Sequence, residues 1–193
     1  MKSALPKRWL SATLCLFLIV CLLVSVVCLD EGSRAGRERL YYDSVLTAAD
    51  AFDLSPALIL AVIRTESDFY KNARSAAGAV GLMQLMPDTF SYLRDTFFEE
   101  SLSSDAIWQP TVNIRYGAFY LSYLLKKFES LDVALAAYNA GEGRVALWLE
   151  DRSLSPDGRT LLRIPYAETE NYVSQTKKYY RHYLKKFHLK EHI

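Results

Sequence analysis

Apolar residues recur at three- and four-residue steps through most of the chain, which is the spacing of amphipathic helices. This spacing predicts a helix over residues 42–52. Ser55 and Pro56 predict the start of another, because serine is a good N-cap and proline is accepted at the first helical position. The segment that follows, Ala57 to Ile63, is apolar on every face, so we expect this helix to run through the core. No stretch shows the sustained alternation of a β-strand, and the pattern therefore predicts a mainly α-helical fold.

The later helices are bounded by proline and glycine residues. We expect further helices at Pro87–Phe90, after Trp108-Gln109-Pro110, at Leu131–Tyr138 and after Ile164-Pro165. The third of these is expected to stop at Asn139-Ala140-Gly141. One alternative for this segment is an ordinary C-cap with Gly141 in the left-handed conformation. Gly78 and Gly81 predict a tight loop, and residues 151–163 predict a polar connection with a turn.

The N-terminus has a different pattern. Residues 10–29 are an uncharged run without proline or glycine, preceded by Lys2, Lys7 and Arg8. As a helix this run would span about 30 Å, the thickness of the hydrocarbon core of a bilayer. It is either a cleaved signal or an uncleaved anchor. We favour the anchor, because no small residue stands where a signal peptidase would cleave. In both cases the basic residues stay in the cytoplasm and the rest of the chain is exported.

The chain is therefore expected to have three parts: an anchor or signal at 1–29, a short polar linker at 30–40, and one domain at 41–193. Removing the first 29 of the 193 residues leaves 164, enough for a single domain with a full hydrophobic core. All three cysteines lie in the apolar run, so the domain can have neither a disulfide framework nor a cysteine zinc site.

Charge argues against a nucleic-acid-binding domain. The chain has 23 basic and 22 acidic residues, and three of the basic ones precede the apolar run, which leaves 20 against 22 and a net charge of about −2. The last seventeen residues are nevertheless rich in lysine and arginine. They form either a solvated helix face or a contact with an anionic wall or lipid surface.

Glu66 is the first candidate for chemistry. It follows the most apolar segment of the domain and lies near the C-terminal end of a predicted helix. The helix dipole and the apolar surroundings both disfavour its ionised form, so we expect a raised pKa. A glutamic acid that stays protonated near neutral pH is suited to act as a general acid in glycosidic cleavage. The alternative is an exposed glutamate beside Arg64.

Three further segments combine flexible backbone with polar or aromatic side chains. They are Gly78–Pro87, which contains Gln84 and Met86; Ala136–Gly141, which contains Tyr138 and Asn139; and Ile164–Val173, which contains Glu168. Each segment alone is equally compatible with a structural role in a loop or a helix cap.

Taken together and in this order, Glu66-Ser67, Gly81–Pro87, Tyr138–Gly141 and Ile164–Val173 resemble the lysozyme-like catalytic domain of lytic transglycosylases. The resemblance covers about Tyr41 to Tyr183. It implies a helical, goose-type-lysozyme-like domain with a substrate groove, preceded here by the N-terminal helix. It also implies a catalytic domain on the extracytoplasmic side of a bacterial cell membrane, acting on the glycan strands of peptidoglycan as a monomer.

The resemblance also implies residue roles. Glu66 is expected to be the sole catalytic acid and base, and Tyr138 to hydrogen-bond and orient it. Substrate contacts are expected from Ser75, Gln84, Met86, Asn139 and Glu168. The implied reaction cleaves the β-1,4 bond between N-acetylmuramic acid and N-acetylglucosamine without water and leaves a 1,6-anhydro end. No cofactor is implied.

Two other functions are compatible with the same residues. The first is a hydrolytic muramidase on the same fold, and the second is a membrane-anchored wall-binding module without catalysis. The presence of Glu66, Gln84 and Tyr138 together argues against the second. We expect no metal site, because His182, His188 and His192 lie near the chain end with no carboxylate clearly placed to join them.

Overall fold

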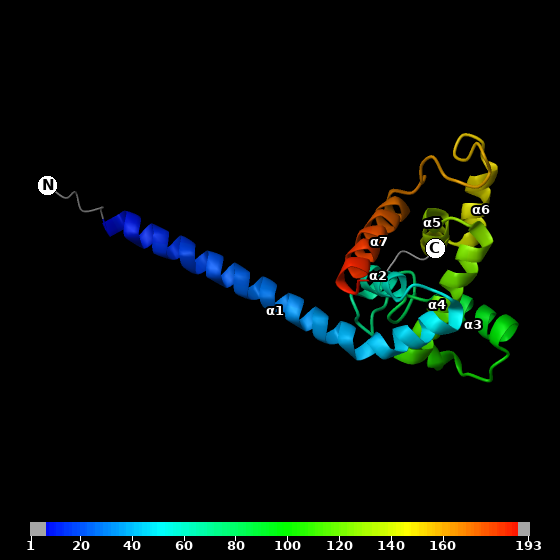
Figure 1. Ribbon diagram of the computed structural model, residues 1–193, viewed down its shortest axis with the longest axis horizontal. Coiled ribbons are helices and arrows are strands. Elements are labelled where there is room, and N and C mark those ends of the chain that lie inside the picture. Colours follow the sequence, from blue (N-terminus) through cyan, green and yellow to red (C-terminus); the bar gives the residue numbers. More distant parts are fainter. Residues whose placement is uncertain (1–6, 189–193) are drawn as a thin grey trace. The chain divides into compact units, whose positions relative to one another are not determined.

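The computed structural model describes the backbone of residues 7–188 and the side chains of 17–21 and 34–188. All the regular elements in the described backbone are helices, and the residues approach strand pairing only at two isolated bridges, Arg74 with Val80 and Val80 with Leu85 (Figure 1). The predicted mainly α-helical class is confirmed. The elements are α1 (Lys7–Phe52), α2 (Pro56–Ser67), α3 (Pro87–Leu93), η1 (Arg94–Phe98), η2 (Ser104–Trp108), α4 (Pro110–Phe128), α5 (Leu131–Ala140), α6 (Glu142–Glu150) and α7 (Ala167–Lys186).

The chain forms two compact units, Met1–Arg39 and Leu40–Ile193. In the first unit the described backbone is part of helix α1, which continues through 30–40, the segment predicted as a linker. Gly36 has no neighbouring atom within 4 Å of the position of a Cβ, and Arg37 to Arg39 are good helix formers, so nothing local ends the helix there.

The predicted membrane segment at 10–29 lies mostly outside the residues whose side chains are described. A search of the described residues finds no helix with the length and apolar character needed to cross a bilayer.

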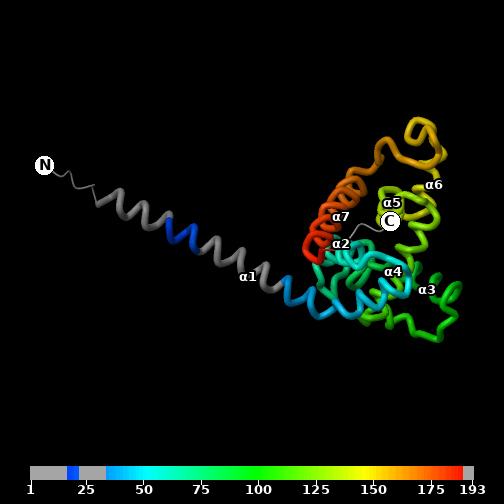
Figure 2. The backbone as a smooth tube through the Cα atoms, viewed as in Figure 1, coloured from blue at the N-terminus to red at the C-terminus, as the bar shows by residue number. Residues whose placement is uncertain are grey.

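Helix α2 is buried in the second unit. Every residue from Ala57 to Ile63 is buried, as the all-round apolar pattern predicts. Pro56 is the first helical residue and Ser55 the N-cap, although the serine hydroxyl makes no capping hydrogen bond. Helix α7 packs along α2, and α5 packs against α4, α6 and α7 (Figure 2). This packing places the C-terminal half of α2 beside α7, which lies more than a hundred residues further along the chain.

Three features of the second unit were not predicted. Helix α6 follows α5 with only Gly141 between them, η1 is a short π-helix, and η2 is a 3₁₀-helix. Gly141 has φ 92° and ψ 135°, so the alternative of a left-handed cap at this residue is excluded. With this conformation the chain passes directly from α5 into α6. Glycine adopts such a positive φ more readily than other residues.

Candidate active site

Glu66 is the penultimate residue of α2 and is half-buried. Loss of hydration on burial raises the pKa of its carboxyl from an ordinary 4.5 to about 7, and the nearby Tyr172 hydroxyl opposes part of this rise. The raised pKa predicted from the sequence is confirmed. Near pH 7 this carboxyl can therefore both donate and accept a proton.

Tyr172 of α7 supplies the hydroxyl beside Glu66. The hydroxyl is buried, and no partner lies at a distance and angle typical of a hydrogen bond. It is nevertheless close enough to Glu66 to lower the pKa of that carboxyl. One turn later, the Thr176 hydroxyl donates to that of Thr65 at 3.0 Å and ties α7 to α2. Our sequence reasoning included Tyr172 in a motif without giving it a role, because its proximity to Glu66 depends on how the two helices pack.

Tyr138 makes a different hydrogen bond from the one expected. Its hydroxyl donates to the carbonyl oxygen of Met83 at 2.9 Å, not to Glu66. The Met83 carbonyl belongs to a tight loop. Its proximity to the C-terminal end of α5 depends on tertiary packing, which the local sequence does not reveal. Tyr138 still lies within electrostatic reach of Glu66, and burial together with that carboxyl raises the pKa of the phenol well above its usual value.

The loop that carries Met83 is held by a buried asparagine that the sequence analysis did not identify. Asn113 of α4 accepts from the Met83 backbone N–H at 2.8 Å and donates to the Val80 and Ile107 carbonyls at 3.0 and 2.9 Å. Gly81 makes room for it, because a Cβ at Gly81 would lie 2.3 Å from the asparagine nitrogen. Asn113 therefore determines the path of this loop.

The same loop is joined to the C-terminal end of α2. The Ser67 hydroxyl lies 2.8 Å from the carbonyl oxygen of Leu82, to which it can donate. Gln84 has a left-handed backbone, with φ 47°, and its side-chain nitrogen donates to the Ala73 and Gly81 carbonyls. The loop is thus held by side chains from α2 and α4 and from within itself.

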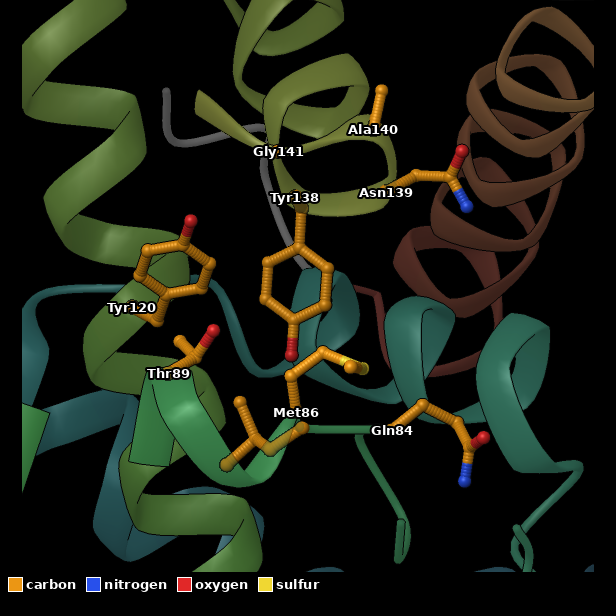
Figure 3. A pocket seen from close by; sticks show the side chains of 9 residues that line it. Gln84, Met86, Thr89, Tyr120, Tyr138, Asn139, Ala140 and Gly141 are labelled. Carbon is orange, nitrogen blue, oxygen red and sulfur yellow. The ribbon is translucent and has the colours of Figure 1, made fainter. Parts of the chain in front are cut away.

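A cavity of about 210 Å³ lies between this loop, the first turn of α3, the middle of α4 and the C-terminal end of α5 (Figure 3). Four of the predicted site residues line it, namely Gln84, Met86, Tyr138 and Asn139. The other lining residues are Leu85, Thr89, Tyr120, Ala140 and Gly141. The cavity joins an exposed methionine, aromatic rings and an amide in one concave surface, as binding sites for small molecules usually do.

Three predicted site residues, Glu66, Ser75 and Glu168, are not among the residues that line this cavity. Glu66 lies within electrostatic reach of Tyr138, which does line it. Ser75 accepts a hydrogen bond from the Ala79 backbone N–H within its own turn. Glu168 is exposed in the first turn of α7. The next residue, Thr169, donates to the Asn139 side-chain oxygen at 2.8 Å and so holds one of the lining residues.

The described residues contain no group of three histidine, cysteine or acidic side chains arranged to hold a metal ion. Of the three histidines considered from the sequence, His192 lies outside the described residues.

Comparison with known proteins places these features in a family. The family model for the transglycosylase SLT domain matches residues 43–157 of this chain. The chain belongs to this family. It is 35% identical, over 138 residues, to a soluble lytic murein transglycosylase of Salmonella typhimurium, an alignment that covers 68% of this chain and 21% of that protein. A membrane-bound lytic murein transglycosylase C of Histophilus somni is 34% identical over 125 residues, covering 58% of this chain and 33% of the relative.

Solved structures of family members share the fold. An inactive mutant of the lytic transglycosylase Slt from Pseudomonas aeruginosa matches with a TM-score of 0.67 and 35% identity, over 77% of this chain and 24% of that one. The 70-kDa soluble lytic transglycosylase of Escherichia coli matches with a TM-score of 0.68 and 28% identity, over 78% and 25%. The chain thus spans about a quarter of the length of the relatives whose structures it matches.

Proposed function

We propose that this SLT-domain chain is a peptidoglycan lytic transglycosylase, which cleaves the β-1,4 bond between N-acetylmuramic acid and N-acetylglucosamine and leaves a 1,6-anhydro end. The observation that carries the proposal is the pKa of Glu66, which burial raises to about 7. Glu66 lies within electrostatic reach of Tyr138. Tyr138 lines a cavity whose lining residues include no carboxylate.

In the first step Glu66 acts as a general acid. Near neutral pH a large fraction of this carboxyl is protonated, so it can transfer its proton to the glycosidic oxygen as the bond to the anomeric carbon breaks. The acetamido group of the substrate can stabilise the positive charge that develops on the sugar.

In the second step the same carboxyl acts as a base. Deprotonated Glu66 takes the proton of the muramic 6-hydroxyl, and the 6-oxygen bonds to the anomeric carbon. The glutamic acid is regenerated and no water is consumed. Hydrolases with two catalytic carboxylates place the second about 5 to 9.5 Å from the first. Asp68, the nearest acidic residue in sequence, is instead the left-handed C-cap of α2.

We propose that the four predicted residues in the cavity contact the sugar. Met86, with 38% of its surface exposed, offers an apolar face, Tyr138 a ring, and Gln84 and Asn139 amide oxygens. We also propose that Ser75 and Glu168 contact the glycan strand, in a groove that extends beyond this cavity.

Mass spectrometry of the products from purified sacculi tests the reaction. We expect muropeptides that end in 1,6-anhydro-N-acetylmuramic acid, lighter by one water than hydrolytic products and resistant to borohydride. Glu66→Gln should release none, because an amide cannot donate and retrieve the proton. Reducible muramic ends would identify a muramidase, and binding to sacculi without any soluble product would identify a wall-binding module.

We further propose that residues 1–29 hold a catalytic domain at 41–193 on the extracytoplasmic face of the cell membrane, as a monomer. The support is the uncharged run at 10–29 behind three basic residues. The naming of one relative as membrane-bound is consistent with this placement.

A further inference from the structure

An aromatic cluster outside the cavity has no part in the chemistry described above. It consists of Tyr92 on α3, Phe97 in η1 and Tyr123 on α4, which we call the outer aromatic cluster. The rings of Tyr92 and Phe97 lie 5.8 Å apart and those of Phe97 and Tyr123 5.7 Å apart. Tyr92 and Phe97 keep 47% and 41% of their surface exposed. Packing of Phe97 on Phe119, with centroids 5.2 Å apart, explains the position of that ring but not the exposure of Tyr92.

The cluster continues the wall of the cavity on two helices at once. Thr89 of α3 and Tyr120 of α4 line the cavity, and in Figure 3 both lie on the opposite side of Tyr138 from Gln84 and Asn139. Residues three apart on a helix share a face, so Tyr92 extends the wall beyond Thr89 by one turn.

On α4 the continuation is a direct contact. The Tyr123 ring is stacked on that of Tyr120, with centroids 6.3 Å apart and planes inclined by 13°. Tyr120 lines the cavity and Tyr123 belongs to the cluster, so the two surfaces are contiguous.

A charged pair borders the same surface. Lys127 lies 5.6 Å from the centre of the Tyr123 ring and forms an ion pair of 2.6 Å with Glu142, which follows the cavity residue Gly141. An aromatic face edged by hydrogen-bonding groups suits a sugar ring, whose C–H face meets the negative face of an aromatic ring while its hydroxyls bind polar groups.

Size supplies the reason for a second site. A cavity of about 210 Å³ is smaller than the usual ligand pocket of roughly 300 to 1,000 Å³ and has room for little more than one sugar ring. A glycan strand is a polymer, so the units next to the one in the cavity must lie on the neighbouring surface.

We propose that Tyr92 and Tyr123 form an additional saccharide-binding site next to the cavity. It stacks one further sugar of the glycan strand, with the Lys127–Glu142 pair at its edge. This inference rests on the proposed action on glycan strands, but it assigns binding to residues outside the catalytic machinery.

The test is calorimetric titration of the full chain in detergent with N-acetylglucosamine oligomers of two to six units. Glu66→Gln is present in every sample to prevent turnover. Without further changes, affinity should rise by about tenfold at the length that first reaches the outer cluster, as expected for about 1.4 kcal/mol of stacking. The double variant Tyr92→Ala/Tyr123→Ala should lose this increase and bind the shortest oligomer unchanged.

Three comparisons make the result decisive. Tyr92→Phe/Tyr123→Phe keeps the rings and should keep the increase, so it guards against a folding defect in the alanine variant. Leu162→Ala, which removes a side chain with 71% of its surface exposed elsewhere, should change nothing. Equal length dependence in the alanine and parent proteins overturns the site while the proposed function stands. If the Glu66→Gln protein binds no oligomer of any length, the additional site is overturned, and muropeptide analysis of the parent decides the proposed function separately.

Discussion

At the residue scale, burial couples the protonation of Glu66 to the stability of the fold. The pKa of its carboxyl is about 7 in the folded protein and about 4.5 when exposed, so the folded state holds the proton more tightly. Between these two values the unfolded chain releases its proton first. The free energy of unfolding therefore falls as pH rises from 4.5 to 7 and is constant with respect to this group above 7.

Glu66→Gln should remove this pH dependence. We expect the variant to be more stable than the parent by about 1 to 3 kcal/mol at pH 8, and equally stable below pH 4.5. Urea denaturation at both pH values measures the difference. A constant gap across the range would mean that Glu66 has an ordinary pKa.

Tyr172 is expected to tune the pKa of Glu66. Its hydroxyl favours the ionised carboxylate, so Tyr172→Phe should raise the pKa of Glu66 further and move the alkaline limb of the kcat/KM profile to higher pH. Tyr179→Phe is the matched control, because Tyr179 lies on the same helix with its ring against Arg64. If both variants have the parent's profile, Tyr172 has no influence on the acid.

Tyr138 is expected to act mainly on stability through its hydroxyl. Tyr138→Phe leaves the Met83 carbonyl without its donor, so the free energy of unfolding should fall by about 1 to 3 kcal/mol. Thermal denaturation measures this loss. An unchanged melting temperature together with a shifted pH–rate profile would show that the hydroxyl serves Glu66 after all.

At the scale of elements, the helices differ in how well local sequence predicted them. Helix α2 was predictable because consecutive residues specify both its start, at Ser55 and Pro56, and its apolar faces, from Ala57 to Ile63. Helix α6 was not, because Gly141 closes α5 and opens α6 without an intervening loop, so the signal that ends one helix concealed the start of the next.

Asn113 shows how one side chain can organise an element that lies far away in sequence. Asn113→Leu keeps the approximate size but leaves the Met83 N–H without its acceptor and removes one donor from each of the Val80 and Ile107 carbonyls, so we expect a loss of about 3 kcal/mol or more in the free energy of unfolding. Activity should fall further than the remaining folded fraction explains, because the loop also positions Gln84 and Met86. Asn171→Ala, at an exposed position on α7, is the control.

At the scale of the whole molecule, the proposed anchor predicts a topology. A tag after Ile193 should be degraded when protease is added outside cells stripped of their wall, whereas a tag before Met1 should be protected. The physical reason is that the three basic residues near the N-terminus favour retention in the cytoplasm. Protection of the C-terminal tag alone would reverse the orientation.

The sequence by itself determined what depends on local spacing. Apolar periodicity established the helical class and the burial of Ala57 to Ile63, and the position of Glu66 at the end of that segment was enough to predict its raised pKa. These properties follow from which face of one helix is apolar, and neighbouring residues decide that.

Only the tertiary structure decided which groups meet. It paired the Tyr138 hydroxyl with Met83, placed Tyr172 beside Glu66, and left Glu66, Ser75 and Glu168 outside the cavity lining. A hydroxyl bonds to whichever acceptor lies within about 3 Å, and that distance is set by the packing of helices and loops that are tens of residues apart in the sequence. Periodicity along the chain carries no information about such distances, so the hydrogen bonds of this site could be read only from the folded protein.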